Sequence, residues 1–226
     1  MKSILLAAVA VTVLTTGAFA ADSVADAPIA STYDWTGAYI GAQAGYAAGG
    51  DVDHFWEGGD PIWDYRLSSR GGFGGIFAGY NHQLDGGVVV GLEGDIGWGD
   101  IKATGNAVGS AIYTSTTKLD WTGSGRVRVG YALDRFMPYV TGGFAVARMQ
   151  FEEKSLGNFY SQASKNLTGW TLGAGVEDAA TENWTVRGEY RYTHYGKKSF
   201  VARQVNENWE ARIRTHDFRL GVAYKF

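Results

Sequence analysis

The last twelve residues of the chain, Thr215 to Phe226, place a large apolar side chain at every second position from Phe218 onward. The residues between these positions are charged or small. Successive side chains of a β-strand point to opposite faces, so the segment predicts a strand with one apolar face and one polar face. Soluble β-sandwiches also alternate in this way, but they rarely end on an aromatic residue that must stay exposed, as Phe226 would.

Seven earlier segments of about ten residues alternate in the same manner, which is the length expected of tilted strands that cross a membrane. They cover about 37–48, 70–82, 88–100, 118–131, 138–151, 167–177 and 184–193. In the weakest of them, 138–151, we assign Val140, Phe144 and Val146 to the outward face. The Asp-Gly and Gly-Gly pairs within 84–87 predict a tight hairpin turn, because these residues tolerate positive φ.

The connections between these segments alternate between short and long. The short ones are 84–87, 132–137 and 178–183, and the long ones are about 49–69, 101–117, 152–166 and 196–213. Outer-membrane barrels have short periplasmic turns and longer extracellular loops. Lipid cannot hydrogen-bond an open strand edge, so only a closed barrel satisfies the backbone. We therefore predict an all-β fold, an eight-stranded antiparallel transmembrane β-barrel with four long extracellular loops.

The amino terminus predicts export. Lys2 precedes an apolar run that is too short to span a bilayer, and Ala18-Phe19-Ala20 has the form of a cleavage site. We assign 1–20 to a signal peptide cut after Ala20, 21–34 to a short periplasmic leader and 35–226 to the barrel. The chain has no Cys and a formal net charge of −3, which argues against disulfides and against a nucleic-acid partner.

The polar faces of the predicted strands carry a balanced set of charges. Five acids face five arginines: Glu93, Asp95, Glu177, Glu189 and Asp217 with Arg126, Arg128, Arg187, Arg191 and Arg219. Eight strands enclose an interior that side chains can fill, and an unpaired charge there would be costly. The pattern favours a paired network that replaces a hydrophobic core, with an ion path or gate as the alternative.

Enzymatic and metal-binding patterns are weak. Glu93 and Asp95 share one face, but neighbouring arginines would keep both ionised, which does not suit acid–base catalysis. The four histidines, His54, His82, His194 and His216, lack metal-ligand spacing. His194 and His216 could approach each other at the outer ends of their strands, with Asp217 nearby. We expect no catalytic residue, no metal site and no cofactor.

The predicted loops are where a ligand could bind. The first is acidic and contains Phe55, Trp56 and Trp63, and the fourth is basic and contains Lys197, Lys198 and Arg203. The two loops would be neighbours, because the first strand pairs with the eighth. They could pair with each other, or the basic loop could meet lipopolysaccharide phosphates and the aromatic loop a host or cell-surface ligand.

Several motifs resemble those of a known family. They are Tyr33-Asp34-Trp35-Thr36-Gly37-Ala38-Tyr39-Ile40-Gly41, Ala78-Gly79-Tyr80-Asn81, Gly91-Leu92-Glu93-Gly94-Asp95, Arg126-Val127-Arg128-Val129-Gly130-Tyr131 and Gly169-Trp170-Thr171-Leu172-Gly173-Ala174-Gly175-Val176-Glu177. In kind and order they are similar to those of the small outer-membrane immunogenic proteins of alphaproteobacteria, which have OmpA-like barrels. The resemblance covers 33–226. It implies a role in outer-membrane integrity and surface antigenicity, with haemin binding or weak pore activity in some relatives, and it supplies no catalytic residue.

The sequence thus predicts a non-enzymatic structural and surface barrel of the cell outer membrane. A narrow porin-like channel is the first alternative, and a surface binder of haemin, lipopolysaccharide or a host molecule is the second. Expected partners are outer-membrane lipids, lipopolysaccharide and the barrel-assembly machinery. We expect that machinery to recognise the last strand, with Tyr224 and Phe226 as its signal.

Overall fold

The computed structural model describes residues 33–56, 65–106, 113–155, 158–202 and 207–226. These form eight β-strands: β1 Gly37–Trp56, β2 Tyr65–Gln83, β3 Val88–Asn106, β4 Tyr113–Tyr131, β5 Phe136–Ser155, β6 Asn158–Ala179, β7 Trp184–Ala202 and β8 Glu207–Lys225. The predicted signal peptide and most of the predicted leader lie outside the described residues. In the described part of the chain, no helix is long and apolar enough to cross a membrane.

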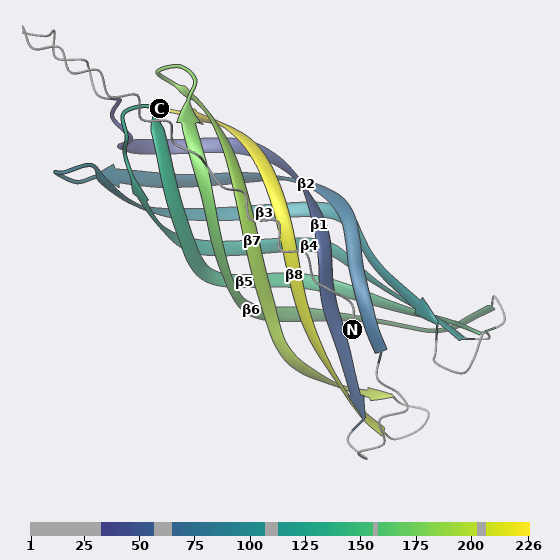
Figure 1. The fold of residues 1–226 in the computed structure, drawn as a ribbon. Helices are drawn as coiled ribbons and strands as arrows, with labels where there is room; N and C mark the ends of the chain where they lie inside the picture. The colour runs from purple at the N-terminus through teal and green to yellow at the C-terminus, as the bar shows by residue number, and fades with distance from the viewer. Residues whose placement is uncertain (1–32, 57–64, 107–112, 156–157, 203–206) are drawn as a thin grey trace, which may run out of the picture. The chain divides into compact units, whose positions relative to one another are not determined.

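The strands form one closed barrel in chain order (Figure 1). Each strand pairs antiparallel with the next, and β1 pairs with β8. The predicted fold class is therefore confirmed. The short connections and the carboxyl terminus lie at one end of the barrel, which is the periplasmic end if the turns follow the usual rule for outer-membrane barrels.

The turn from β2 to β3 is the predicted tight hairpin. Gly86 and Gly87 both have a φ of 85°, a conformation that glycine adopts without steric cost. The backbone N–H of Leu84 donates to Val88 O at 2.7 Å. This turn fixes the register between β2 and β3, in which Gln83 lies opposite Val89.

The strands are about twice as long as predicted. They contain 19 to 22 residues, where about 9–11 suffice to cross a membrane. The prediction that 49–69, 101–117, 152–166 and 196–213 are loops was therefore largely wrong, since most of these residues lie in strands. Beyond the membrane no lipid contacts the outward face, so apolar side chains are not needed there. The strands therefore continue to pair without the alternating apolar pattern of their lower halves.

At the outer end the barrel wall divides between two pairs of strands. The pairing of β6 with β7 ends at Trp170↔His194, and that of β2 with β3 ends at Arg70↔Lys102, although all four strands continue. The other neighbours stay paired almost to their outer ends. The outer extension therefore consists of two four-stranded sheets, β3 to β6 and β7, β8, β1 and β2 (Figure 1).

The outward face of the lower halves is apolar. Leu220 is 71% exposed, Leu92 66% and Phe144 64%, although all three are large hydrophobic residues. Val140 and Phe144 are exposed, which confirms the outward assignment for β5. On most strands this face spans about eleven residues, from Trp184 to His194 on β7 for example. That length matches the hydrocarbon core of a membrane crossed by tilted strands.

Candidate functional site: the charged lumen

The inward positions of β7 run the length of the lumen and show how it is filled. Between Thr185 and Tyr195 every second side chain points inward and is buried. Thr185, Arg187, Glu189 and Arg191 each contact a charged side chain of another strand. Tyr195 instead belongs to an apolar cluster. All ten of the charged residues named from the sequence line this lumen, and their side chains are at most 8% exposed.

Glu93 on β3 is the centre of the middle layer. Its carboxylate forms short ion pairs with Arg126 and Arg187, and it accepts a hydrogen bond from Tyr39 Oη at 2.9 Å. Arg126 also contacts Glu189 Oε1 at 2.8 Å. One carboxylate thus joins β1, β3, β4 and β7 across the lumen.

Asp95 is the centre of the next layer toward the outside. Arg191 Nη1 lies 3.1 Å from its Oδ2, and Arg219 Nη1 lies 3.3 Å from its Oδ1. Arg219 also contacts Asp217 Oδ2 at 2.6 Å, and Ser124 Oγ donates to Asp95. In a low-dielectric interior such pairs offset their desolvation only when the geometry is good, and every carboxylate here has at least one arginine.

The layer nearest the periplasm contains one ion pair. Arg128 contacts Glu177, which also accepts a hydrogen bond from Thr185 Oγ1 at 2.6 Å. The Arg128 guanidinium lies 3.8 Å from the centre of the Tyr139 ring, and Tyr139 Oη donates to Glu189 Oε2 at 3.2 Å. Tyr139 therefore links this pair to the middle layer, and all ten charges belong to one connected network.

Sequence reasoning missed the neutral members of the network. Gln43 Oε1 accepts from Arg187 at 3.3 Å, and Thr141 Oγ1 accepts from Arg126 at 3.0 Å. The Arg187 guanidinium also lies 3.4 Å from the centre of the Phe77 ring. A Cβ at Gly41 would overlap that ring, so glycine is required there. Gln43 and Thr141 occupy inward-facing alternate positions of β1 and β5, and this alternation was the signal available in the sequence.

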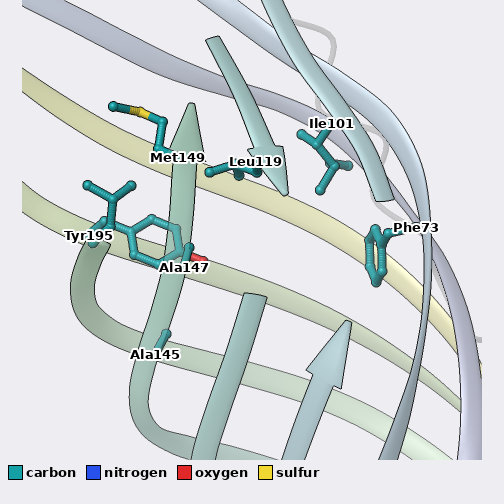
Figure 2. Close-up of a cluster of buried hydrophobic side chains, with 9 residues drawn as sticks. Phe73, Ile101, Leu119, Ala145, Ala147, Met149 and Tyr195 are labelled. Carbon is teal, nitrogen blue, oxygen red and sulfur yellow. The ribbon is translucent and has the colours of Figure 1, made fainter. Parts of the chain in front are cut away.

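An apolar cluster, here called the outer cluster, fills the lumen beyond the charges. Nine buried residues from seven strands form it (Figure 2): Ala47, Phe73, Ile101, Leu119, Ala145, Ala147, Met149, Leu167 and Tyr195. A cavity of about 10 Å³ lies between this cluster and the pair Asp217–Arg219. That space holds about one water molecule.

A second apolar cluster, here called the inner seal, closes the periplasmic end. Tyr33 and Trp35, which precede β1, pack with Val89, Met137 and Ala179. Trp35 N donates to Gln83 Oε1 at 2.9 Å, and Trp35 Nε1 donates to the backbone oxygen of Asp134 at 2.9 Å. Part of the predicted leader therefore packs against the barrel in a fixed position.

Burial and hydrogen bonding shift two pKa values at this seal. Burial, reinforced by the Glu177 carboxylate, raises the pKa of Tyr33 to about 12. The hydrogen bond from Thr36 N to Asp34 Oδ1, 2.8 Å long, lowers the pKa of Asp34. At neutral pH Tyr33 is therefore neutral and Asp34 is ionised.

Four of the six predicted loop residues lie in strands. Phe55 and Trp56 belong to β1, and Lys197 and Lys198 belong to β7. Trp63 and Arg203 lie outside the described residues. The register of β1 with β8 pairs Trp56 with Trp209, so the outer end of β1 does adjoin that of β8.

His194, His216 and Phe226 lie on the outward face. His194 lies opposite Arg214 and His216 opposite Tyr192, whereas Asp217 points into the lumen, so the expected proximity of Asp217 to the two rings was wrong. Among the described residues, no group of three or more His, Asp or Glu side chains could hold a metal ion. Phe226 is 74% exposed, and its ring lies 5.2 Å from that of Tyr224. Recognition of these two residues during assembly stays a prediction.

Known proteins share both the sequence and the fold. A 31 kDa outer-membrane immunogenic protein of Brucella melitensis is 39% identical over the full length of both chains. A 22 kDa outer membrane protein of Rhizobium leguminosarum is 33% identical over 89% of this chain and 82% of the relative. The crystal structure of OprG from Pseudomonas aeruginosa has the same fold, with a TM-score of 0.57 at 13% identity over 85% of this chain and 97% of that one.

A family model described as "Outer membrane protein beta-barrel domain" matches residues 6–226. This match covers nearly the whole chain, and the Brucella and Rhizobium relatives are named as outer-membrane proteins. The chain therefore belongs to the outer-membrane β-barrel family that includes these immunogenic proteins, and it resides in the cell outer membrane.

Proposed function

We propose that the protein is a non-enzymatic structural barrel that strengthens the outer membrane and presents its outer strand ends at the cell surface, without conducting ions. The observation that carries the proposal is the filling of the lumen. The inner seal adjoins the inner end of β7, where Ala179 lies opposite Thr185, and the ion-pair network and the outer cluster follow along that strand.

An ion path would require continuous water, and the lumen leaves little room for it. The cavity beside Asp217 holds about one water molecule, and the clusters at the two ends consist mostly of side chains that offer water no hydrogen bond. The charges are also paired with one another, so a passing ion would have to separate buried pairs. These features favour the structural role over the channel.

A deletion strain tests the structural role. We expect loss of the gene to increase the uptake of a hydrophobic fluorescent dye across the outer membrane, and the wild-type gene to restore the barrier. A variant in which 57–64 and 203–206 are replaced by Gly-Ser segments of equal length is the matched control. It should restore the barrier equally well, because the replacements leave the sequences of all eight described strands unchanged.

Unchanged dye uptake after deletion would contradict the proposal. Restoration by the wild type alone would instead favour a ligand-binding role for the connections between β1 and β2 and between β7 and β8.

A further inference from the structure

Three nitrogen-bearing side chains lie together on the outward face of β7 and β8. His194 is opposite Arg214, and His216 follows two residues later on the same face of β8. The outward direction is fixed by alternation, because Phe218 and Leu220, at the next two even positions, are 59% and 71% exposed. The three residues therefore form one patch, which we call the β7–β8 cationic patch.

The hydrogen bonds of the two imidazoles leave one nitrogen of each ring available. Gly196 N donates to His194 Nδ1 at 3.1 Å, so the neutral ring carries its proton on Nε2. The Tyr190 hydroxyl lies 2.6 Å from His216 Nδ1, and a hydrogen bond donated by Tyr190 leaves Nε2 of that ring as a donor. Both rings can thus present an N–H group beside the Arg214 guanidinium.

Arg214 has an unused donor. Its Nε is buried and makes no hydrogen bond, and within the described ranges Arg214 forms no ion pair. The neighbouring carboxylate, Asp217, points into the lumen and is neutralised by Arg219. A cation and two N–H donors are complementary to a phosphate group.

Aromatic rings surround the patch on the membrane side. His194 stacks on Trp170 with ring centres 5.6 Å apart, and His216 lies 5.0 Å from the Tyr192 ring. Below these rings the face becomes fully apolar at Phe218 and Leu220. Tryptophan and tyrosine girdles mark the level of lipid headgroups on a barrel, so the donors lie where a headgroup meets its acyl chains.

Two backbone features border the patch on its outer side. The register places Lys197 opposite Arg212 at the next paired position of β7 and β8. The pairing of β6 with β7 ends at Trp170↔His194. Among the described residues, the edge of β7 that faces β6 is therefore unpaired beyond the patch.

We propose that the β7–β8 cationic patch binds the phosphate group of a phosphorylated glycolipid in the outer leaflet. Arg214 provides the charge, and His194 and His216 provide directed hydrogen bonds. The acyl chains pack below on Phe218 and Leu220. Because the donors and the apolar surface are contiguous, the site suits a membrane-anchored phosphate better than a free one. The proposal does not depend on whether the lumen conducts.

Native mass spectrometry of the folded barrel tests this site. The probe is bisphosphorylated lipid A in detergent, compared with lipid A from which both phosphates have been removed. We expect the wild type to prefer the phosphorylated form and Arg214→Gln to bind it at least about tenfold more weakly, as the loss of a charge-assisted hydrogen bond implies. The double variant His194→Gln, His216→Gln replaces two neutral rings with neutral amides, and it should also weaken binding. This variant provides the test if Arg214→Gln fails to fold.

Arg148→Gln is the matched control, because Arg148 is an arginine at the outer edge of the outward face but lies on β5, opposite Trp121. It should leave binding unchanged. Equal binding of the two lipid A forms by the wild type, or equal loss in Arg148→Gln and Arg214→Gln, would overturn the proposal. Displacement of lipid A by millimolar inorganic phosphate would show that the site takes free phosphate and would also overturn it.

Discussion

Individual residues hold the lumen together through buried ion pairs, and the pair Arg128–Glu177 is the simplest to test. Removing one partner leaves an unpaired buried charge, which typically costs about 3–5 kcal/mol. We expect Glu177→Gln to lower the free energy of unfolding by about that amount. Urea titration of the detergent-folded barrel, followed by the loss of tryptophan fluorescence, measures it.

Arg135→Gln is the control for this prediction, since Arg135 and Glu182 form an ion pair whose side chains are 42% and 74% exposed. Exposed pairs contribute about 0–1 kcal/mol. If Glu177→Gln and Arg135→Gln destabilised the barrel equally, the network would not be the core that we describe.

The tyrosine of the inner seal makes a prediction about alkaline pH. The hydroxyl of Tyr33 is buried without a hydrogen-bond partner, so Tyr33→Phe should cost little or nothing at pH 7. Its pKa is about 12 in the folded protein against 10.0 ordinarily, so the unfolded chain releases the proton first as pH rises. The stability that comes from keeping Tyr33 protonated in the folded protein is therefore fully present below pH 10. It is lost between about pH 10 and pH 12, as the unfolded chain ionises first.

Unfolding curves of the wild type and Tyr33→Phe from pH 8 to pH 12 check this sign. The stability of Tyr33→Phe should fall less steeply above pH 10 than that of the wild type. Parallel curves would mean that Tyr33 is hydrated and that the inner seal is open.

At the level of single residues, the sequence predicted the charged side chains and their direction but not the neutral partners. Arginines and acids at alternate positions are conspicuous, because such residues are rarely buried without partners. Thr141, Gln43 and Tyr39 carry no charge, so their residue types do not mark them as members of an ion-pair network. Their roles depend on cross-strand register, which the structure supplies.

The two apolar clusters close the lumen as separate elements, and each contains one methionine. Met137 lies in the inner seal and Met149 in the outer cluster, with exposures of 0% and 4%. We expect Trp35→Ala to accelerate the peroxide oxidation of Met137 severalfold and to leave Met149 unchanged, because oxidation follows exposure. Peptide mass spectrometry after timed oxidation reports both sites in one sample.

Tyr195→Ala should give the reverse pattern, with faster oxidation of Met149 alone. Faster oxidation of both methionines in either variant would indicate global loosening, and the clusters would then not be independent seals.

Strand order and the centres of the strands were predictable, but the outer strand halves and the inner seal were not. The alternating pattern arises because lipid covers one face, as at Val127 and Val129, so it disappears where the strands leave the membrane. Tyr33 precedes the first alternating segment and has no periodicity to mark it. Its position depends on contacts with residues 101 positions away, such as the hydrogen bond from Tyr33 N to Asp134 Oδ1.

The whole molecule is a barrel whose interior has its own core. Closure follows from the sequence, because eight lipid-facing strands cannot leave an open edge. Whether the interior is filled does not follow. Leu119 lies in the alternating segment 118–131 in phase with the outward residues Val127 and Val129, but a register shift between Leu119 and Trp121 buries it in the lumen. The outer cluster was therefore invisible to sequence reasoning, although it decides between a plug and a channel.

Conductance of the refolded protein in a planar bilayer is the most direct test of whether the lumen is filled. Folding is first verified by the shift in gel mobility between unboiled and boiled samples. We expect a silent bilayer for the wild type, and destabilisation rather than a defined conductance for the double variant Arg126→Ala, Arg128→Ala. Reproducible conductance steps from folded wild-type protein, altered in the double variant, would contradict it.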